Sequence, residues 1–482
     1  MSVFPVAALR QAFLALPKQP RESDSEALDI RYFYAPLSHA KALHPDNMLV
    51  EGVHGVGKSE WFLQLSNPDH LQAIAAILPR SGLENTECSV GFGQVSSPNH
   101  PSKRSLSNLL ECHDAQTIWD TVIALGILNE FYYVDGWSKA IQKYKNDVDN
   151  YDNRLRQRDH ELVDENKKHI VLFDALDYAA DDWQILKTLL KGLCQAALKF
   201  RAFRAIRLKI FVRPDMLADP SVFAFTGGSK VISSKLTLEW QKVELFNLLW
   251  QYLANSPEGG EAFRTGCEQA FGQSWHQHPD ADSWLIPDAM RRDEALQRKI
   301  FHALTGEWMG DSAKSGYPYA WLPTHLEDGF GKVSPCSFLA ALQAAAASAE
   351  LQEDDCYPLN AQALKKGVQQ ASQMQVRTLN ERYHWINVLL KGKELSFPCD
   401  FGDIENLWCS DNAMSKLKQI IRESDAIPPP SYSESDFSEE DLKQDLIALG
   451  IFQPMHDGRI NMPDVYRVGY GLRRKGGVMP VK

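Results

Sequence analysis

A glycine-rich segment that ends in a lysine and a serine is the part of this sequence best suited to chemistry. The segment Gly52 to Ser59 reads GVHGVGKS and fits the pattern G-x-x-x-x-G-K-[ST] of a phosphate-binding loop. Its glycines let the backbone point several N–H groups at one polyphosphate. Lys58 can reach the β- and γ-phosphates, and the Ser59 hydroxyl can take one Mg²⁺ position. The pattern predicts ATP and Mg²⁺ as cofactors and the following nucleotide-binding residues: Gly52, His54, Gly55, Val56, Gly57, Lys58, Ser59 and Glu60.

The sequence around this loop predicts a strand before it and a helix after it. The apolar run Met48 to Val50 predicts a short buried strand, and we expect the helix to begin near Lys58. The positive end of that helix would point at the same anion. A chance match in a glycine-rich turn would lack this context, so the context favours phosphate binding.

Two further segments predict buried strands that end in charged residues. In HIVLFDALD, residues 169–177, a run of apolar residues leads to Asp174, which is placed to hold Mg²⁺ together with Ser59. Asp177 would lie one turn further on, where it could polarise the attacking water.

The other strand, LKIFVRPD at 208–215, ends at Arg213, on the sheet edge that faces a ligand in parallel folds. Arg213 could sense the γ-phosphate or form a salt bridge to Asp215, and the sequence leaves both open. The predicted catalytic residues are therefore Lys58, Asp174, Asp177 and Arg213, and the predicted metal ligands are Ser59 and Asp174.

Composition limits the classes of protein to which the chain can belong. Its 482 residues predict about three domains, and 44% hydrophobic and 23% charged residues are typical of a soluble globular protein. The net charge of −11 argues against wholesale binding to nucleic acid or to an anionic membrane, although not against a local basic patch. No apolar run approaches the length needed to cross a bilayer. The eight cysteines are scattered without a C-x-x-C pair, which predicts no zinc or disulfide framework and a reducing cytoplasm.

Periodicity and turn signals divide the chain into an α/β P-loop core, a parallel sheet flanked by helices, followed by helical and winged-helix-like parts. The predicted divisions are an N-terminal helix at 1–30, the ATPase core at 31–235 with a helical insertion at about 113–165, a helical lid at 236–350, a helical region at 351–426, a linker at 427–440, and a winged-helix-like domain with a basic tail at 441–482.

Several segments allow two interpretations from sequence alone. An apolar stripe from Trp137 to Leu155 predicts a long helix that either packs on its own domain or forms an arm for a partner. The aromatic run Tyr32 to Tyr34 could contact the nucleotide base or belong to a core. Near the end, a helix at 441–449 and the Asp457-Gly458 turn predict helix plus hairpin. The basic residues from Arg467 to Lys475 could form a solvated tail or contact phosphate.

With these motifs in this order, the chain resembles the STAND group of P-loop ATPases, within the wider AAA+, KAP-type and origin-recognition class. The resemblance rests on GVHGVGKS, VLFDALD, KIFVRPD, the helix LEWQKVEL at 238–245 and the winged-helix-like end. It implies slow ATP hydrolysis used as a switch, in which nucleotide holds the lid and winged helix closed on the core. It also implies that Lys58 and Ser59 are the Walker A pair, that Asp174 and Asp177 are the Walker B acids, and that Arg213 is a sensor.

The chain departs from that group in two respects. The lid-helix position that often carries a sensing arginine is Cys336 here, and no internal repeat of a TPR, WD40 or leucine-rich period is present. We therefore expect the sensor or effector to be a separate polypeptide. Four arginines are possible fingers toward a neighbouring subunit's nucleotide: Arg204, Arg207, Arg291 and Arg292.

Two functions from different classes follow. The first is an ATP-dependent switch that controls assembly with a partner protein, with a possible homo-oligomer, in a bacterial anti-phage defence or conflict system by family analogy. The alternative is a DNA-associated ATPase that resembles origin-recognition or transposition loaders, with the C-terminal region on DNA. A small-molecule kinase would leave the long helical C-terminal half without a role.

Overall fold

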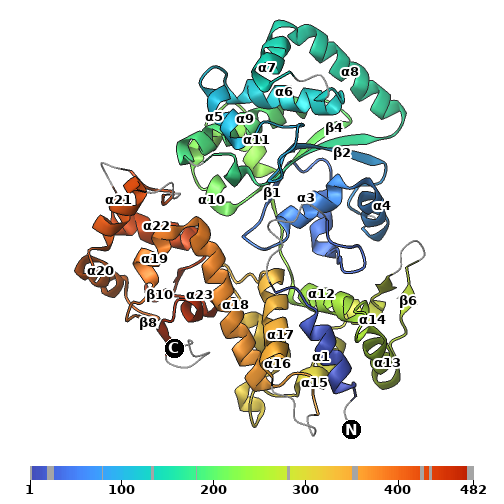
Figure 1. The fold of residues 1–482 in the computed structure, drawn as a ribbon, viewed down its shortest axis with the longest axis vertical. Helices are drawn as coiled ribbons and strands as arrows, with labels where there is room; N and C mark the ends of the chain where they lie inside the picture. Colours follow the sequence, from blue (N-terminus) through green and yellow to red (C-terminus); the bar gives the residue numbers. More distant parts are fainter. Residues whose placement is uncertain are drawn as a thin grey trace. The chain divides into compact units, whose positions relative to one another are not determined.

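The computed structural model divides the chain into two compact units. We call Glu22–Leu28 with Ala35–Glu239 the core unit, and Met1–Arg21, Asp29–Tyr34 and Trp240–Lys482 together the helical unit. Each is described here by itself (Figure 1). The described residues are 3–18, 27–78, 80–131, 135–180, 182–278, 283–349, 356–423, 428–433 and 437–474.

The core unit is built on a five-stranded parallel sheet. Its strands are β1 (Leu49–Glu51), β2 (Thr86–Phe92), β3 (Lys168–Phe173), β4 (Ile206–Val212) and β5 (Leu236–Thr237). Their spatial order is β2-β3-β4-β1-β5, so β4 lies between β1 and β3. The middle strands β3, β4 and β1 are mostly apolar and buried, as strands covered by helices on both faces must be. The predicted α/β class is confirmed.

Helices connect these strands and begin at capping residues that the sequence supplies. Asn67, Asp114 and Asp182 each accept backbone N–H bonds at a helix start. The α-helices of the core unit are α2 (Ala40–Leu43), α3 (Lys58–Ser66), α4 (Pro68–Ile77), α5 (Lys103–Leu110), α6 (Ala115–Ile127), α7 (Trp137–Asn146), α8 (Val148–Asp164), α9 (Trp183–Phe200), α10 (Pro214–Leu217) and α11 (Gly228–Ser233). The described part of this unit also contains the short 3₁₀ helices η1 (Leu37–His39), η3 (Leu176–Tyr178) and η4 (Pro220–Phe223).

The apolar stripe from Trp137 to Leu155 lies on two helices rather than one. Asp147, at φ −138° and ψ 38°, breaks the helix between α7 and α8. Ile141, Tyr144 and Leu155 are buried, and both helices pack against α6 (Figure 1). The stripe therefore packs on its own unit, as the first of the two interpretations states.

The helical unit begins with α1 and resumes after the core. Its first part contains α1 (Val6–Leu14), α12 (Lys242–Ala254), α13 (Gly260–Phe271), α14 (Asp288–Arg292), α15 (Glu294–Thr305), α16 (Pro318–Thr324), α17 (Pro335–Ser348) and α18 (Ala361–Arg382), with the 3₁₀ helix η5 (Ala313–Ser315). A small hairpin, β6 (His276–Gln277) with β7 (Trp284–Leu285), interrupts what the sequence predicts as all helix. Arg10 on α1 donates to the carbonyl of Ala346 near the end of α17. No helix among the described residues is both long and apolar enough to cross a membrane.

The aromatic run at 32–34 belongs to this unit's packing. Tyr32 stacks on Tyr252 with 5.3 Å between ring centroids, and the Tyr34 hydroxyl accepts a hydrogen bond from Asn247. Phe33 and Tyr34 are buried. The structure therefore favours the core interpretation of these aromatics over contact with a nucleotide base.

The C-terminal part has the winged-helix-like form that the sequence predicts. It comprises α19 (His384–Leu390), β8 (Ser396–Phe397), α20 (Phe401–Ser410), α21 (Ala413–Glu423), α22 (Glu439–Ala448), β9 (Gln453–Pro454), β10 (Ile460–Asn461), α23 (Asp464–Gly469) and β11 (Arg473–Arg474). The hairpin β9–β10 turns at Gly458, whose φ is +87°, and Ile460 also bridges Cys399 just after β8.

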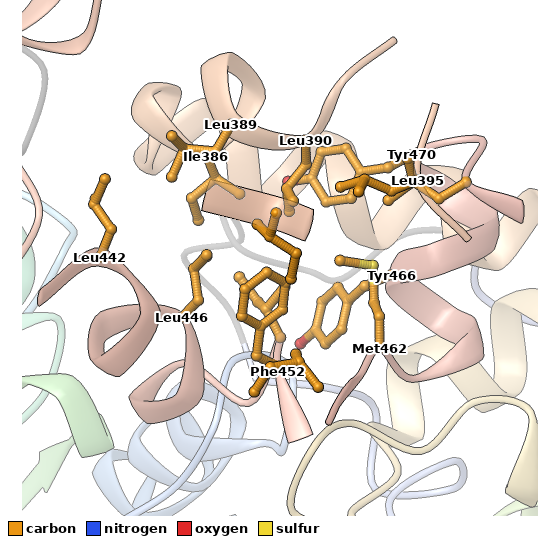
Figure 2. Packing of buried hydrophobic residues seen from close by; sticks show 14 of the residues in the cluster. Ile386, Leu389, Leu390, Leu395, Leu442, Leu446, Phe452, Met462, Tyr466 and Tyr470 are labelled. Carbon is orange, nitrogen blue, oxygen red and sulfur yellow. The ribbon is translucent and has the colours of Figure 1, made fainter. Parts of the chain in front are cut away.

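One hydrophobic core holds this part together. Figure 2 shows Ile386 of α19, Leu446 of α22 and Tyr466 of α23 in the same cluster. This core therefore includes residues well before 441, where the sequence analysis begins the domain. Within the predicted linker 427–440, Tyr432 and Phe437 pack against the same core.

One residue of the predicted basic tail is buried in the structure. Arg467 is 1% exposed and donates to the Asp464 carboxylate and to the Leu472 carbonyl. It is a structural residue, which corrects the expectation of a basic surface at this position. Arg474 also donates to Asp464, while residues 475–482 lie outside the described residues.

A buried lysine fixes the end of α2 to the sheet. The Nζ of Lys209 on β4 donates to the carbonyls of Ala42, His44 and Asn47 at 2.9, 3.0 and 2.7 Å. Its side chain is fully buried, so removing the ammonium would leave three carbonyls without this donor.

We expect Lys209→Met to lower the free energy of unfolding by about 3 kcal/mol, because buried carbonyls lose their partner. Urea unfolding, with amide exchange of residues 206–212 as the local readout, measures the loss. Lys41→Met, at an exposed position of α2, is the matched control. Equal stability of the two variants would contradict the assigned role.

Candidate nucleotide-binding site

The loop between β1 and α3 is attached to the neighbouring strand where it begins. The Gly52 N–H donates to the Val212 carbonyl at the end of β4, at 3.0 Å. A Cβ on Gly52 would lie 2.5 Å from the Val56 side chain, so no larger residue fits there. Gly57 precedes α3 with φ +104°, a conformation that side chains rarely adopt. Both glycines are therefore required by the shape of the loop.

The loop's lysine lies back across it. Lys58 is the first residue of α3, and its Nζ donates to the carbonyls of Gly52 and Val53 at 2.8 and 3.0 Å. Burial lowers the pKa of Lys58 to about 8, and the nearby carboxyl of Asp174 opposes this shift. The ammonium thus lies inside the loop, where a phosphate would need it.

The acid at the end of β3 meets the serine of the loop. Asp174 is the first residue after β3, and its N–H donates to the Phe92 carbonyl on β2. Its carboxyl is buried and hydrogen-bonds with Ser59. Burial raises the pKa of Asp174, while Ser59 and Lys58 oppose the rise. The two predicted metal ligands are thus brought together.

A strained residue turns the chain directly after Asp174. Ala175 has φ +53° and ψ 31°, in the left-handed region. This turn starts η3, which carries Asp177 toward the end of β4. Ala175 therefore carries backbone strain that a glycine at this position would not.

Arg213 contacts both acids that the sequence offers it. Its Nη1 lies 2.8 Å from Asp177 Oδ2, while its Nε and Nη2 donate to the two oxygens of Asp215 at 3.0 and 2.7 Å. The salt bridge to Asp215 is therefore present, and Arg213 also lies at the sheet edge that carries the loop. The arginine joins the end of β4 to η3.

Of the remaining predicted nucleotide-binding residues, three lie in the loop and one has its side chain engaged outside it. His54, Gly55 and Val56 lie in the loop itself. The Glu60 carboxylate, in contrast, accepts hydrogen bonds from Leu28 N and Gln64 Nε2, so its side chain is engaged outside the loop.

The sequence analysis did not identify Glu51 as a site residue. This last residue of β1 is 8% exposed, and Lys235 and Thr237 beside β5 bind its carboxylate at 2.8 and 3.1 Å. The pair of residues fixes β5 to β1 next to the loop. The acid that ends the apolar run MLVE was the available signal.

These residues fit a nucleotide with Mg²⁺. The loop needs glycine where a Cβ would clash or strain the backbone, the buried Lys58 supplies positive charge, and Ser59 and Asp174 supply the oxygen ligands that Mg²⁺ prefers. Elsewhere, the described residues contain no cluster of three or more His, Cys, Asp or Glu able to hold a metal. The eight cysteines are all free.

Comparison with known proteins yields only distant similarities. No protein-family model and no curated protein matches the chain. Among solved structures, the ORC2 protein of Aeropyrum pernix in ADPNP and ADP complexes is 12% identical, with 95% of this chain and 98% of that chain covered and a TM-score of 0.30. Cdc6p from Pyrobaculum aerophilum is 10% identical, with coverages of 88% and 85% and a TM-score of 0.27. At these identities and TM-scores, neither likeness supports an inference about this chain.

We expect Ala175→Gly to raise the free energy of unfolding by about 1 kcal/mol, because glycine adopts a positive φ without strain. Urea unfolding measures the change. Ala179→Gly is the control, since Ala179 has φ −71° and glycine should destabilise it by about 1 kcal/mol. A destabilising effect at both positions would show that Ala175 is not strained.

Proposed function

We propose that this chain is an ATP-binding switch that hydrolyses ATP slowly and controls assembly with a separate sensor or effector protein. The observation that carries the proposal is the convergence of Lys58, Ser59 and Asp174 at the carboxyl edge of a parallel sheet, beside the ion pair of Arg213 with Asp177. Parallel sheets bind ligands at this edge. The resemblance to STAND ATPases supports the switch, and the defence setting rests on that analogy alone.

The loop residues would hold the nucleotide by exchanging the partners they have now. Lys58 Nζ would leave the carbonyls of Gly52 and Val53 for phosphate oxygens. Ser59 and Asp174 would hold Mg²⁺, which neutralises charge on the phosphates when bound. The N–H groups of the loop and of the first turn of α3 would face the phosphates.

The contacts of Asp177 support slow hydrolysis. An acid that orients water must keep an oxygen available for that water. Asp177 lies in an ion pair with Arg213 that is largely buried, with side chains 14% and 8% exposed. Separation of this pair would release Arg213 to interact with a γ-phosphate and Asp177 to orient water.

The surface of the winged-helix-like part favours a protein partner over DNA. In DNA-binding proteins with a helix-turn-helix, the recognition helix enters the major groove, where positive charge is needed near phosphates. Here the helix before the β9–β10 hairpin is α22, whose first turn carries Glu439, Glu440 and Asp441. These acids would repel a DNA backbone and count against the loader function, while the exposed Arg473 of the basic tail is the described residue that could still contact phosphate.

We expect ATP with Mg²⁺ to increase the particle mass of the purified protein, and Lys58→Ala to abolish this growth, because the loop loses its buried cation. Light scattering with ADP, with ATP and with ATP plus duplex DNA measures it. Nucleotide binding by calorimetry is recorded for each sample.

Growth with ATP alone supports a self-assembling switch. A protein that binds ATP but stays monomeric would show that assembly requires the partner protein. That partner can then be captured from the native host with ATP-loaded protein. Growth only with DNA would contradict the proposal and support the loader. Absence of ATP binding in the natural protein would reject both.

We expect Asp177→Asn to reduce ATP hydrolysis about 100-fold, since the amide is a poor base for orienting water. Affinity for ATP should stay within about threefold, because Asp177 is not a loop residue. Asp219→Asn is the matched control, as Asp219 forms an ion pair with Lys187 in the same unit. Equal hydrolysis by both variants would exclude Asp177 from the reaction.

A further inference from the structure

The helix that carries the phosphate-binding lysine also holds the ends of the core unit's connecting segments. Among the described residues, the chain passes between the two units after Leu28, after Tyr34 and after Glu239. Leu28 and Glu239 both belong to the core unit, and each is held, directly or through one side chain, by residues of α3. These contacts lie entirely inside the core unit.

Two side chains of α3 hold Leu28 by its backbone. Glu60 Oε1 accepts a hydrogen bond from the Leu28 N–H at 2.9 Å. Gln64 Nε2 donates to the Leu28 carbonyl at 2.8 Å and also to Glu60 Oε1 at 2.7 Å. Glu60 and Gln64 are four residues apart and therefore lie on the same face of the helix. Leu28 is thus fixed at both of its peptide groups.

A third side chain of α3 reaches Glu239 through a histidine. The Trp61 indole N–H donates to His39 Nδ1 at 2.9 Å, and His39 Nε2 lies 3.1 Å from the Glu239 carbonyl. Trp61 and His39 are 2% and 1% exposed. The Ser38 hydroxyl donates to the same carbonyl at 3.2 Å.

The direction of this chain of hydrogen bonds is fixed by chemistry. An indole nitrogen can only donate, so His39 Nδ1 must accept and Nε2 must carry the proton that it gives to Glu239. Burial lowers the pKa of His39 to about 4, which agrees with a neutral ring. The neutral ring therefore transmits the position of Trp61 to the last residue of the core unit.

We propose that α3 is a linkage between the phosphate loop and the two segments that lead into the helical unit. Lys58 and Ser59 form its first turn, and Glu60, Trp61 and Gln64 follow within two turns of the same rigid helix. A shift at its N-terminus moves Leu28 and Glu239 together. The inference rests on the proposed function, because nucleotide at the loop supplies the shift. Trp61, His39 and Gln64 are positioning residues.

The test is amide hydrogen exchange of the full-length protein with and without a non-hydrolysable ATP analogue and Mg²⁺. In the natural protein, the analogue should change exchange about fivefold or more in segments 27–34 and 236–242. Trp61→Phe keeps an aromatic side chain but removes the indole N–H together with the five-membered ring. It should bind the analogue with nearly natural affinity but lose the change at 236–242 while it keeps that at 27–34.

Two further variants make the experiment specific. Gln64→Leu removes the bond to the Leu28 carbonyl and leaves that of Glu60 to the Leu28 N–H, so it should reduce the change at 27–34 and keep that at 236–242. Trp119→Phe is the matched control, because the Trp119 indole also donates a buried hydrogen bond at 2.9 Å, to the Leu189 carbonyl on α9. This control loses a comparable bond in the same unit and should respond like the natural protein.

The outcomes separate this inference from the proposed function. Segment-specific losses in Trp61→Phe and Gln64→Leu support the linkage. Natural responses in both variants, or an analogue that binds without changing either segment of the natural protein, would overturn it while nucleotide binding stands. If the natural protein does not bind the analogue, the proposed function fails and the linkage fails with it.

Discussion

The position of β4 between β1 and β3 is the constraint on which the site depends. Neighbouring strands lie about 4.8 Å apart, so β1, which leads into the loop, and β3, which leads to Asp174, are about 10 Å apart. The bond from Gly52 N–H to the Val212 carbonyl ties the loop to the intervening strand. Arg213 follows that strand and contacts Asp177 beyond β3. The sheet order thus places Arg213, at the end of β4, within reach of Asp177 beyond β3.

The parts of the site that the sequence predicts are those encoded by local spacing. The loop, the start of α3 and the acid after β3 each follow from a few consecutive residues. The contact of Arg213 with Asp215 was one of the two alternatives that the sequence offers, whereas its contact with Asp177 could not be predicted, because it depends on which strands are neighbours and on how η3 turns. The same holds for Glu51, whose partners are distant in sequence.

The C-terminal half shows a different limit of sequence reasoning. Proline and serine between 427 and 440 are typical of a linker, yet Tyr432 and Phe437 return to the hydrophobic core. Charge alone likewise placed Arg467 in a basic tail, whereas Asp464 binds it inside the fold. Composition describes what a segment tolerates, and only the packing partners decide whether it is exposed. Helix and hairpin were predictable because their turn and period are local.

Attachment of α3 to the connecting segments gives the switch a physical route. A phosphate loop that touched only the sheet could bind nucleotide without moving anything else, because the buried parallel strands are rigid. A helix whose first turn holds the loop's lysine and serine, and whose next turns hold Leu28 and Glu239, cannot shift without moving both. Because α3 is attached at two separate places, to Leu28 and to Glu239, it cannot easily rotate about one attachment while the other stays fixed. A change at the phosphates would therefore reach both segments together, and a ligand that shifts such an equilibrium must differ in its contacts with the two states.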